Sequence, residues 1–320
     1  MRLPRIFNKP LFFLAFLSIL GMLAGTSPAL AATYYSLANG NWNANGTWTT
    51  TACATQGAMT MNAGAIPGAG DVVIICTGNT VTVSAAAAAN AVSFEGNGLA
   101  GLVVNSGIAL TVTNALTLNW ASLTLNGSLS VGAATAIGDG THTSTLTMGA
   151  GSSAGFTGAV TVFNSGTLDV AAGSATLLGN LDLRTGGTLN NGASGNIVLE
   201  GSFSHAGTFI PNTGTFSFRG SVDQALNGSS ATTTFYNLTL NKTAGSVLMG
   251  DAINPAHNVE VTNTLTLTKG RIKTAGGSSA NYVSLTGPSL VGGSSVSYIN
   301  GKLLRVVSTG TATLSWPIGP

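Results

Sequence analysis

The sequence predicts an all-β protein, a right-handed parallel β-helix whose coils of about 20 residues carry three short strands each. Three observations support this prediction: an apolar–polar–apolar phrase that recurs twelve times, regular spacing between the copies, and turns rich in Gly, Asn and Ser. Alternation with a period of two is typical of strands with one buried face. Strands this short bury that face only by stacking on neighbours.

The twelve copies lie between residues 116 and 285, and most place Thr, Ser or Asp between two apolar residues. They are residues 116–118, 123–125, 129–131, 160–162, 168–170, 181–183, 197–199, 216–218, 238–240, 259–261, 265–267 and 283–285. A series of this kind indicates a solenoid in which like residues stack on like.

The spacing between apolar starts predicts the coil length. Three faces in 19 residues follow from the starts at Leu110, Leu116, Leu123 and Leu129. Farther on, intervals of 21, 19, 22 and 21 residues separate positions 160 and 181, 197 and 216, 216 and 238, and 238 and 259. The mature chain would then form about 13 coils.

One segment has helix propensity without a helical pattern. Ala85–Ala89 is a run of five alanines with no amphipathic pattern around it. We expect a turn or a corner packed with small side chains rather than a helix.

Residues 1–31 are predicted to be a signal peptide. Arg2, Arg5 and Lys9 precede the apolar run at residues 11–23, and small residues lead to a cleavage site between Ala31 and Ala32. The run is shorter than the roughly 20 residues that a membrane-spanning helix needs. We therefore expect an exported protein, secreted or at the cell surface, with no transmembrane segment in the mature chain.

The charge of the mature chain excludes several partners. Removal of the three basic residues of the leader leaves 8 of 11 Lys and Arg against 9 Asp and Glu, a net charge of −1 (8 − 9). No basic stripe remains for nucleic acid, and no acidic run suggests a calcium-binding repeat. Charged residues make up only 6% of the chain, so uncharged polar residues provide its solubility.

Two cysteines, Cys53 and Cys76, are present. In an exported protein an even number favours a disulfide, and two buried free thiols are the alternative. A bridge here would contribute roughly 3 kcal/mol by the chain-entropy argument. A zinc site is disfavoured because neither cysteine has a histidine nearby.

Residues 32–84 differ from the rest and are predicted to form an N-terminal cap and the first coils. Trp42 and Trp48 follow glycine turns and precede a Pro67-Gly68 turn, Asp71 and a Val/Ile strand. This order resembles the start of bacterial secreted β-helix proteins and the glycine-rich G-eight domain of extracellular proteins. The two tryptophans are equally suited to covering the open end of the core.

Residues 85–320 are predicted to be the β-helix repeat region. Its distal part resembles repeat segments of large bacterial secreted or surface β-helix proteins. The segments that carry this resemblance are residues 216–228, 235–242, 265–272, 298–305 and 316–319. The resemblance implies an adhesin-like surface protein, with extracellular polysaccharide or another cell-surface ligand as partner. We expect the rod to continue beyond residue 320 and to associate end to end.

The titratable residues of the sequence do not form a convincing catalytic group. The acidic residues of the mature chain are scattered singly: Asp71, Glu95, Asp139, Asp169, Asp182, Glu200, Asp223, Asp251 and Glu260. The best cluster is Asp169 and Asp182 with Arg184, but 13 residues separate the two aspartates, which places them on different faces. The histidines, His142, His205 and His257, have turn-like contexts and no nucleophile motif nearby. No catalytic residue, cofactor or metal site is predicted.

Three functional hypotheses follow, in descending order of support. The first is a non-enzymatic structural or adhesive rod, and the second is a carbohydrate-active β-helix with clustered carboxylates. The third is an ice-binding solenoid, suggested by Thr-x-Thr tracts at residues 111–113, 264–266 and 266–268. We expect Ser130, Asp169, Asp182 and Glu260 to interrupt such an array.

Overall fold

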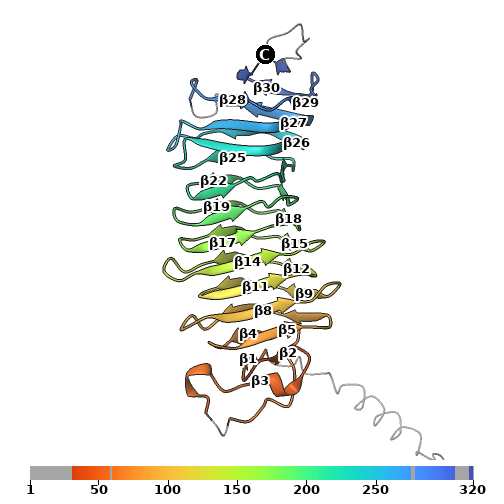
Figure 1. Ribbon diagram of the computed structural model, residues 1–320, viewed down its shortest axis with the longest axis vertical. Helices are drawn as coiled ribbons and strands as arrows, with labels where there is room; N and C mark the ends of the chain where they lie inside the picture. Colours follow the sequence, from red (N-terminus) through yellow and green to blue (C-terminus); the bar gives the residue numbers. More distant parts are fainter. Residues whose placement is uncertain (1–30, 58–59, 275–277, 307–316, 320) are drawn as a thin grey trace, which may run out of the picture. The chain divides into compact units, whose positions relative to one another are not determined.

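The computed structural model describes residues 31–57, 60–274, 278–306 and 317–319, so residues 1–30 of the predicted leader lie outside the described residues. The chain divides into two compact units, residues 1–31 and 32–320. The second unit is a parallel β-solenoid of about 11 turns (Figure 1), which confirms the predicted all-β fold class. Within the described residues, helix is limited to two 3₁₀ turns, η1 (Asn45–Thr47) and η2 (Cys53–Thr55).

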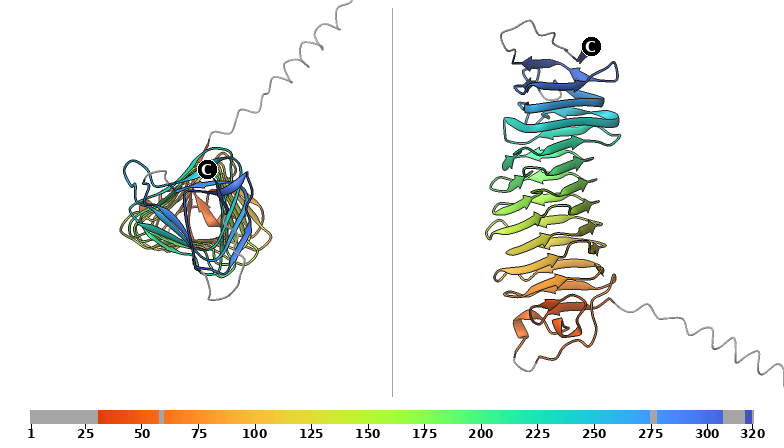
Figure 2. Two further views of the ribbon diagram at one scale, coloured as in Figure 1. Left: turned by 90° about the horizontal axis from the view of Figure 1, so that it is seen from above. Right: turned by 45° about the vertical axis from the view of Figure 1, so that its right-hand side comes forward.

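Each regular coil contributes one strand to each of three parallel stacks, and seen along the axis the coils have a three-sided outline (Figure 2). The first stack is an eight-stranded sheet, called sheet B below. Its strands are β2 (Gly40–Asn41), β5 (Thr80–Val83), β8 (Ala100–Val104), β11 (Ala121–Leu125), β14 (Ser144–Met148), β17 (Gly166–Asp169), β20 (Thr188–Asn190) and β23 (Thr208–Ile210).

The second stack runs along another side of the solenoid. Its short strands are β6 (Ala87–Ala89), β9 (Ala109–Val112), β12 (Ser128–Val131), β15 (Ser153–Phe156), β18 (Ser174–Leu177), β21 (Asn196–Leu199), β24 (Thr215–Phe218) and β29 (Ser289–Gly292).

The third stack begins with β1 and carries the polar surface described below. Its short strands are β1 (Thr33–Ser36), β4 (Val72–Ile75), β7 (Ala91–Phe94), β10 (Leu116–Leu118), β13 (Thr135–Ile137), β16 (Val160–Val162), β19 (Leu181–Leu183), β22 (Phe203–His205), β25 (Gln224–Asn227), β30 (Ser297–Asn300) and β32 (Ile318–Gly319).

Two long strands, β26 (Thr232–Met249) and β27 (Asn258–Lys273), each pass around the solenoid and pair with strands of the second and third stacks. The first parts of β26 and β27 pair with each other, and the ladder continues into β28 (Tyr282–Leu285) and β31 (Lys302–Arg305). One short strand, β3 (Trp48–Thr49), is antiparallel to β1.

The register confirms most of the predicted spacing. Every apolar–polar–apolar phrase falls in a strand or at its end, and the expected partners pair in four cases: residues 110 with 129, 160 with 181, 197 with 216, and 216 with 238. The fifth expectation is wrong, since Leu238 pairs with Leu265 and Val259 pairs with Thr233. Residues 250–257 lengthen this coil, because they form a longer connection than residues 228–231 one coil earlier.

The number of coils is lower than the expected 13 because the N-terminal segment is not a set of regular coils. Thr33 of β1 pairs with Val72 of β4, a step of 39 positions (72 − 33) between neighbouring strands of one stack. The described residues between them, called the cap below, contain only the short strands β2 and β3 and the turns η1 and η2.

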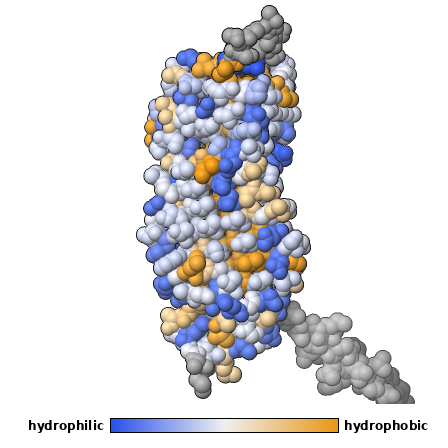
Figure 3. Space-filling model, in the orientation of Figure 1, coloured by the Kyte–Doolittle hydropathy of each residue, from blue (hydrophilic) through white to orange (hydrophobic). Residues whose placement is uncertain are grey.

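The core is a continuous column of inward side chains from all three stacks. Leu102, Leu123 and Leu146 of sheet B are stacked in register and at most 1% exposed. A cluster of aromatic rings fills the distal part, where Phe216 lies 5.5 Å from Phe203 and 5.1 Å from Phe235 between ring centroids. On the face shown in Figure 3 the surface is mostly weakly polar or hydrophilic, with apolar residues in separate patches.

The alanine run contains a strand, which corrects the expectation of a turn or corner. Ala87–Ala89 form β6, which pairs in parallel with residues 110–112 of β9. Hydrogen bonds to the neighbouring coil decide the backbone conformation here, since helix propensity is worth well under about 1 kcal/mol per residue.

The tryptophans of the cap are fully buried. Trp42 and Trp48 are both 0% exposed, and their rings meet edge to face with centroids 5.1 Å apart. Trp48 Nε1 donates a hydrogen bond to the carbonyl oxygen of Trp42 at 2.6 Å. The pair belongs to the same core cluster as the strands, so it fills the proximal end of the core.

The predicted disulfide is present. Cys53 in η2 and Cys76 after β4 are bridged, with their Cα atoms 5.5 Å apart. Glu95 lies beside the two sulfur atoms. Because both sulfurs are in the bridge, they offer no thiolate to a metal.

Loss of this bridge should loosen the cap. The double variant Cys53→Ser/Cys76→Ser should lose about 3 kcal/mol of local stability, because the unbridged loop gains conformational entropy in the unfolded state. Coil stability in a solenoid depends mainly on neighbouring coils. Limited proteolysis should therefore show faster cleavage within residues 50–70 and little change in the distal coils.

The control is Ala54→Ser, an exposed position in η2 directly after Cys53. Cap proteolysis of the double variant at the rate of the control would contradict this prediction.

Candidate functional site

The structure places the three histidines in two different environments. His142 lies on a surface loop, whereas His205 ends β22 and is 6% exposed, and His257 precedes β27 and is 0% exposed. The turn-like context expected for His205 is therefore wrong. It pairs with Leu183 of the preceding coil and occupies an inward, core position of its strand.

The buried histidines are joined by a threonine. The hydroxyl of Thr233 lies 2.8 Å from His205 Nδ1 and 2.8 Å from His257 Nε2. Asn281 Oδ1 accepts a hydrogen bond of 3.0 Å from the backbone N–H of His257. Among the described residues neither ring is hydrogen-bonded to a carboxylate or a cysteine, so this group is a polar brace across the core rather than a catalytic triad.

Burial keeps both rings neutral. Burial first of all, and the neighbouring His257 in addition, lower the pKa of His205 to about 4. Burial also lowers the pKa of His257. Protonation of either ring would place a charge inside the core, which costs free energy.

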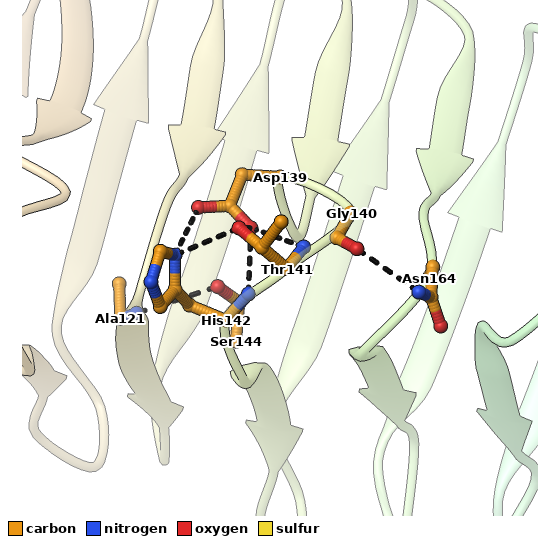
Figure 4. A network of polar contacts seen from close by, with 7 residues as sticks. All are labelled: Ala121, Asp139, Gly140, Thr141, His142, Ser144 and Asn164. Atoms are coloured by element: carbon orange, nitrogen blue, oxygen red, sulfur yellow. Dashed lines mark hydrogen bonds and ion pairs between the residues drawn. The ribbon is translucent and has the colours of Figure 1, made fainter.

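A loop at the edge between the third stack and sheet B holds a compact polar network (Figure 4). Asp139 accepts hydrogen bonds of 2.8 Å from the backbone N–H groups of Thr141 and His142, and one of its oxygens lies 2.8 Å from His142 Nδ1. These bonds, first of all the one from the backbone of His142, hold the pKa of Asp139 well below its usual range. Asn164 ties the loop to the next coil through a 2.9 Å hydrogen bond to the carbonyl oxygen of Gly140.

The ring of His142 stacks on Trp120 of the preceding coil. Their centroids are 4.2 Å apart and their planes differ by 7°. Trp120 has a φ of 49°, a left-handed conformation that is uncommon for a large side chain. The stacked pair therefore stands on a backbone whose conformation the surrounding coils enforce.

The next two coils continue this edge with an aromatic ring and a cation. Phe163 and Arg184 follow the paired residues Val162 and Leu183, so they lie in adjacent coils. The guanidinium carbon of Arg184 is 4.4 Å from the Phe163 ring centroid, and its Nε donates a 2.9 Å hydrogen bond to Asp182. We call Trp120, His142, Phe163 and Arg184 the aromatic corner.

A shallow groove of about 520 Å³ lies on the third stack. Its centre is a row of paired outward residues, Thr161, Asp182, Ser204 and Asn227. The full lining is Ala159, Thr161, Asn180, Leu181, Asp182, Ser202, Ser204, Ala225, Asn227, Asp251 and Asn254. We call this the polar groove. It reaches the aromatic corner through the ion pair of Asp182 with Arg184.

The loop of residues 250–257 forms one end of the polar groove. Asp251 accepts backbone hydrogen bonds from Ile253 at 2.8 Å and Asn254 at 2.6 Å, and Asn227 donates to its other oxygen. The backbone hydrogen bond from Asn254 is the main cause that lowers the pKa of Asp251, so the carboxylate stays ionised. Sequence reasoning missed this loop, although its Gly250 and Pro255 were a possible signal.

The two carboxylates of the groove belong to coils that are not adjacent. Asp182 and Asn227 are two strand steps apart, about 10 Å, and Asp251 belongs to the coil beyond. Glycosidase carboxylates lie about 5 to 9.5 Å apart. Asp169 and Asp182 lie on different stacks, as the sequence predicted, and Asp169 accepts a 3.0 Å hydrogen bond from Asn190.

Sheet B carries a threonine column that the sequence reasoning did not find. Successive strands pair Ser122, Thr145, Thr167, Thr188 and Thr208 in register on the outward face. Thr124 and Thr147 begin a second column, which Asp169 interrupts. The column is visible only from the strand pairing, because the coils that contribute to it differ in length.

The expectation that four residues interrupt the threonine tracts is only partly confirmed. Thr111 pairs with Ser130 in the second stack, as expected. Asp182 and Glu260 lie in other ladders and do not interrupt that tract. Counting along the chain could not separate the three stacks.

The predicted cleavage site lies at the start of the solenoid. Ala31 is exposed, and Ala32 is partly buried directly before β1. Within the described residues, no helix has the length and apolar character needed to cross a membrane.

Fold and surface together define a disulfide-bridged parallel β-solenoid with a polar groove. Comparisons with protein-family models, curated proteins and solved structures found no match.

Acid should destabilise the protein through the buried histidines. An unfolded His has a pKa of 6.5 and folded His205 one of about 4, so between these values the unfolded chain binds more protons. The free energy of unfolding should therefore be fully retained above pH 6.5 and fall towards pH 4. His205 accounts for about 3 kcal/mol of this loss.

The denaturation midpoint, measured at several pH values between 4 and 6.5, tests this loss of stability. His205→Leu should flatten the acid-side slope, whereas His142→Gln, at a surface loop, should leave it unchanged. A slope that survives His205→Leu in full would refute the assignment.

Proposed function

We propose that the protein is a secreted, non-enzymatic, adhesin-like β-solenoid rod that binds extracellular glycans through the polar groove and the aromatic corner. The observation that carries this proposal is the row of outward polar residues, Thr161, Asp182, Ser204 and Asn227, fixed in register beside partly exposed rings.

The chemistry of the row suits a sugar chain. Hydroxyl, carboxylate and amide groups recur at the strand spacing of about 4.8 Å, similar to the length of one sugar ring. These groups pair with sugar hydroxyls, while aromatic rings pack against the apolar faces of sugars. Because each side chain stands on a strand of a rigid stack, little ordering is needed on binding.

The carboxylate separation supports binding over cleavage. Asp182 and Asn227, which contacts the Asp251 carboxylate, are two strand steps apart, on the order of 10 Å, which is wider than the close carboxylate pair of a retaining glycosidase. The carbohydrate-active reading therefore ranks second.

Other features support an exported surface protein. The signal peptide, cleavage between Ala31 and Ala32, the G-eight-like cap and the adhesin-like repeats all belong to this proposal. The disulfide fits an oxidising compartment. Nucleic acid is not expected as a partner. The rods are expected to associate end to end.

Binding should depend on the groove. On a glycan array the processed protein should bind a polysaccharide, and Asp182→Asn should weaken that binding about tenfold, since one charge-assisted hydrogen bond is worth roughly 1.5 kcal/mol or more. Asp169→Asn, the same change on another stack, is the matched control and should bind normally.

The same polysaccharide should stay intact on prolonged incubation. Release of reducing ends that Asp182→Asn abolishes would establish the enzymatic alternative instead. Equal loss of binding in both variants would exclude the groove as the binding site.

Ice binding is a second candidate, favoured by the threonine column of sheet B. The column repeats hydroxyl and methyl groups at about 4.8 Å on parallel strands. In the described chain, the hydroxyls of Thr145, Thr167 and Thr188 have no protein hydrogen-bond partner, so they are free to order water.

Ice recrystallisation in a frozen protein solution tests this candidate. If sheet B binds ice, the protein should suppress crystal growth, and Thr167→Tyr should abolish suppression by disrupting the flat array. Thr239→Tyr, an outward position of the second stack, should retain it. Unimpeded crystal growth with the unaltered protein would eliminate the candidate.

A further inference from the structure

Asp71 holds the backbone nitrogen of Ala32. Its Oδ1 accepts a hydrogen bond of 2.8 Å from that N–H, and its Oδ2 accepts one of 2.8 Å from Gly68. Both Ala32 and Asp71 are partly buried. The contact fixes the start of β1 against β4, where Thr33 pairs with Val72 and the N–H of Val72 donates to the carbonyl oxygen of Ala32 at 2.9 Å.

The nitrogen held by Asp71 is the one that the predicted cleavage would release. Hydrolysis of the Ala31–Ala32 peptide bond adds hydroxide to the Ala31 carbonyl carbon and leaves a protonated amine on Ala32. The boundary between the two compact units falls at the same bond, and Ala31, the residue before that bond, is exposed. A neutral amide donor would thus become an ammonium group beside a carboxylate.

We propose that Asp71 is the receptor site for the α-ammonium group of the processed chain, so that processing strengthens the closure of the first coil. A charge-assisted hydrogen bond is roughly twice as strong as a neutral one. The proposal rests on cleavage at Ala31–Ala32 and is independent of glycan or ice binding.

The Pro67–Asp71 turn holds the Asp71 carboxylate in place. Asp71 donates its backbone N–H to the Gly68 carbonyl oxygen at 3.0 Å while its side chain accepts from the Gly68 N–H. These two bonds fix the carboxylate before the chain end arrives. The receptor is therefore preorganised and loses little side-chain entropy on forming the ion pair.

A stability cycle tests the proposal. Two chains are compared, the processed one that begins at Ala32 and one extended by Gly-Ser, which keeps Ala32 as an amide. Asp71→Asn is made in each. We expect this change to lower the melting temperature of the processed chain by about 2 °C more than that of the extended chain.

The excess should shrink in about 1 M NaCl, where the Debye length is about 3 Å. Glu95→Gln is the matched control, since Glu95 also accepts a backbone hydrogen bond, at 3.2 Å from Thr77, but has no chain end beside it. It should cost the same in both chains. An equal cost of Asp71→Asn in both chains would overturn the proposal, because a purely structural hydrogen bond predicts that result.

A second readout does not depend on stability. At about pH 7, acylation of the Ala32 amine should be roughly threefold to tenfold slower in the processed protein than in its Asp71→Asn variant, because the ion pair keeps the amine protonated. Mass spectrometry of the product follows the reaction and also confirms the N-terminus. Equal acylation rates, or a mature N-terminus elsewhere, would refute the proposal.

Discussion

In-register hydrogen bonding between successive coils is the constraint on which the rest of the structure depends. A strand such as β10 has only three residues and no stability of its own. Its backbone groups are satisfied by β7 on one side and β13 on the other. Since each coil provides the partners for the next, register passes from coil to coil, and the position of every outward side chain is set by it.

This constraint separates the roles of strands and connections. A strand position is repeated in every coil, so its inward residue packs in the core and its outward residue joins a row. Connections can lengthen while the strands on either side still pair, as at residues 250–257, which extend one coil. There β26 and β27 remain paired in parallel, with shifts of register between Phe235 and Ser246. The loops at Asp139 and Asp251 therefore add local chemistry to a regular scaffold, each held by backbone hydrogen bonds to its own carboxylate.

The fold could be predicted from the sequence because its signal is local and repeated. The alternation in Leu123-Thr124-Leu125 and its spacing from other copies predicted the strands, the three faces and most pairs. Contacts across coils were harder, since each depends on the lengths of the intervening turns. Stacking of His142 on Trp120 and the bridge from His205 through Thr233 to His257 were missed for this reason. Asp251 was seen only as an isolated charge, because its groove joins five successive coils.

The register itself is the claim that every proposed surface requires, and engineered cysteines measure it directly. Thr145→Cys with Thr167→Cys pairs two outward positions that are in register. At a strand spacing of about 4.8 Å they should form a disulfide under mild oxidation, detected by peptide mapping beside the native bridge. Thr145→Cys with Asp169→Cys is two residues out of register, about 8 Å apart, and should stay reduced. A disulfide that forms efficiently between positions 145 and 169, but not between positions 145 and 167, would contradict this register.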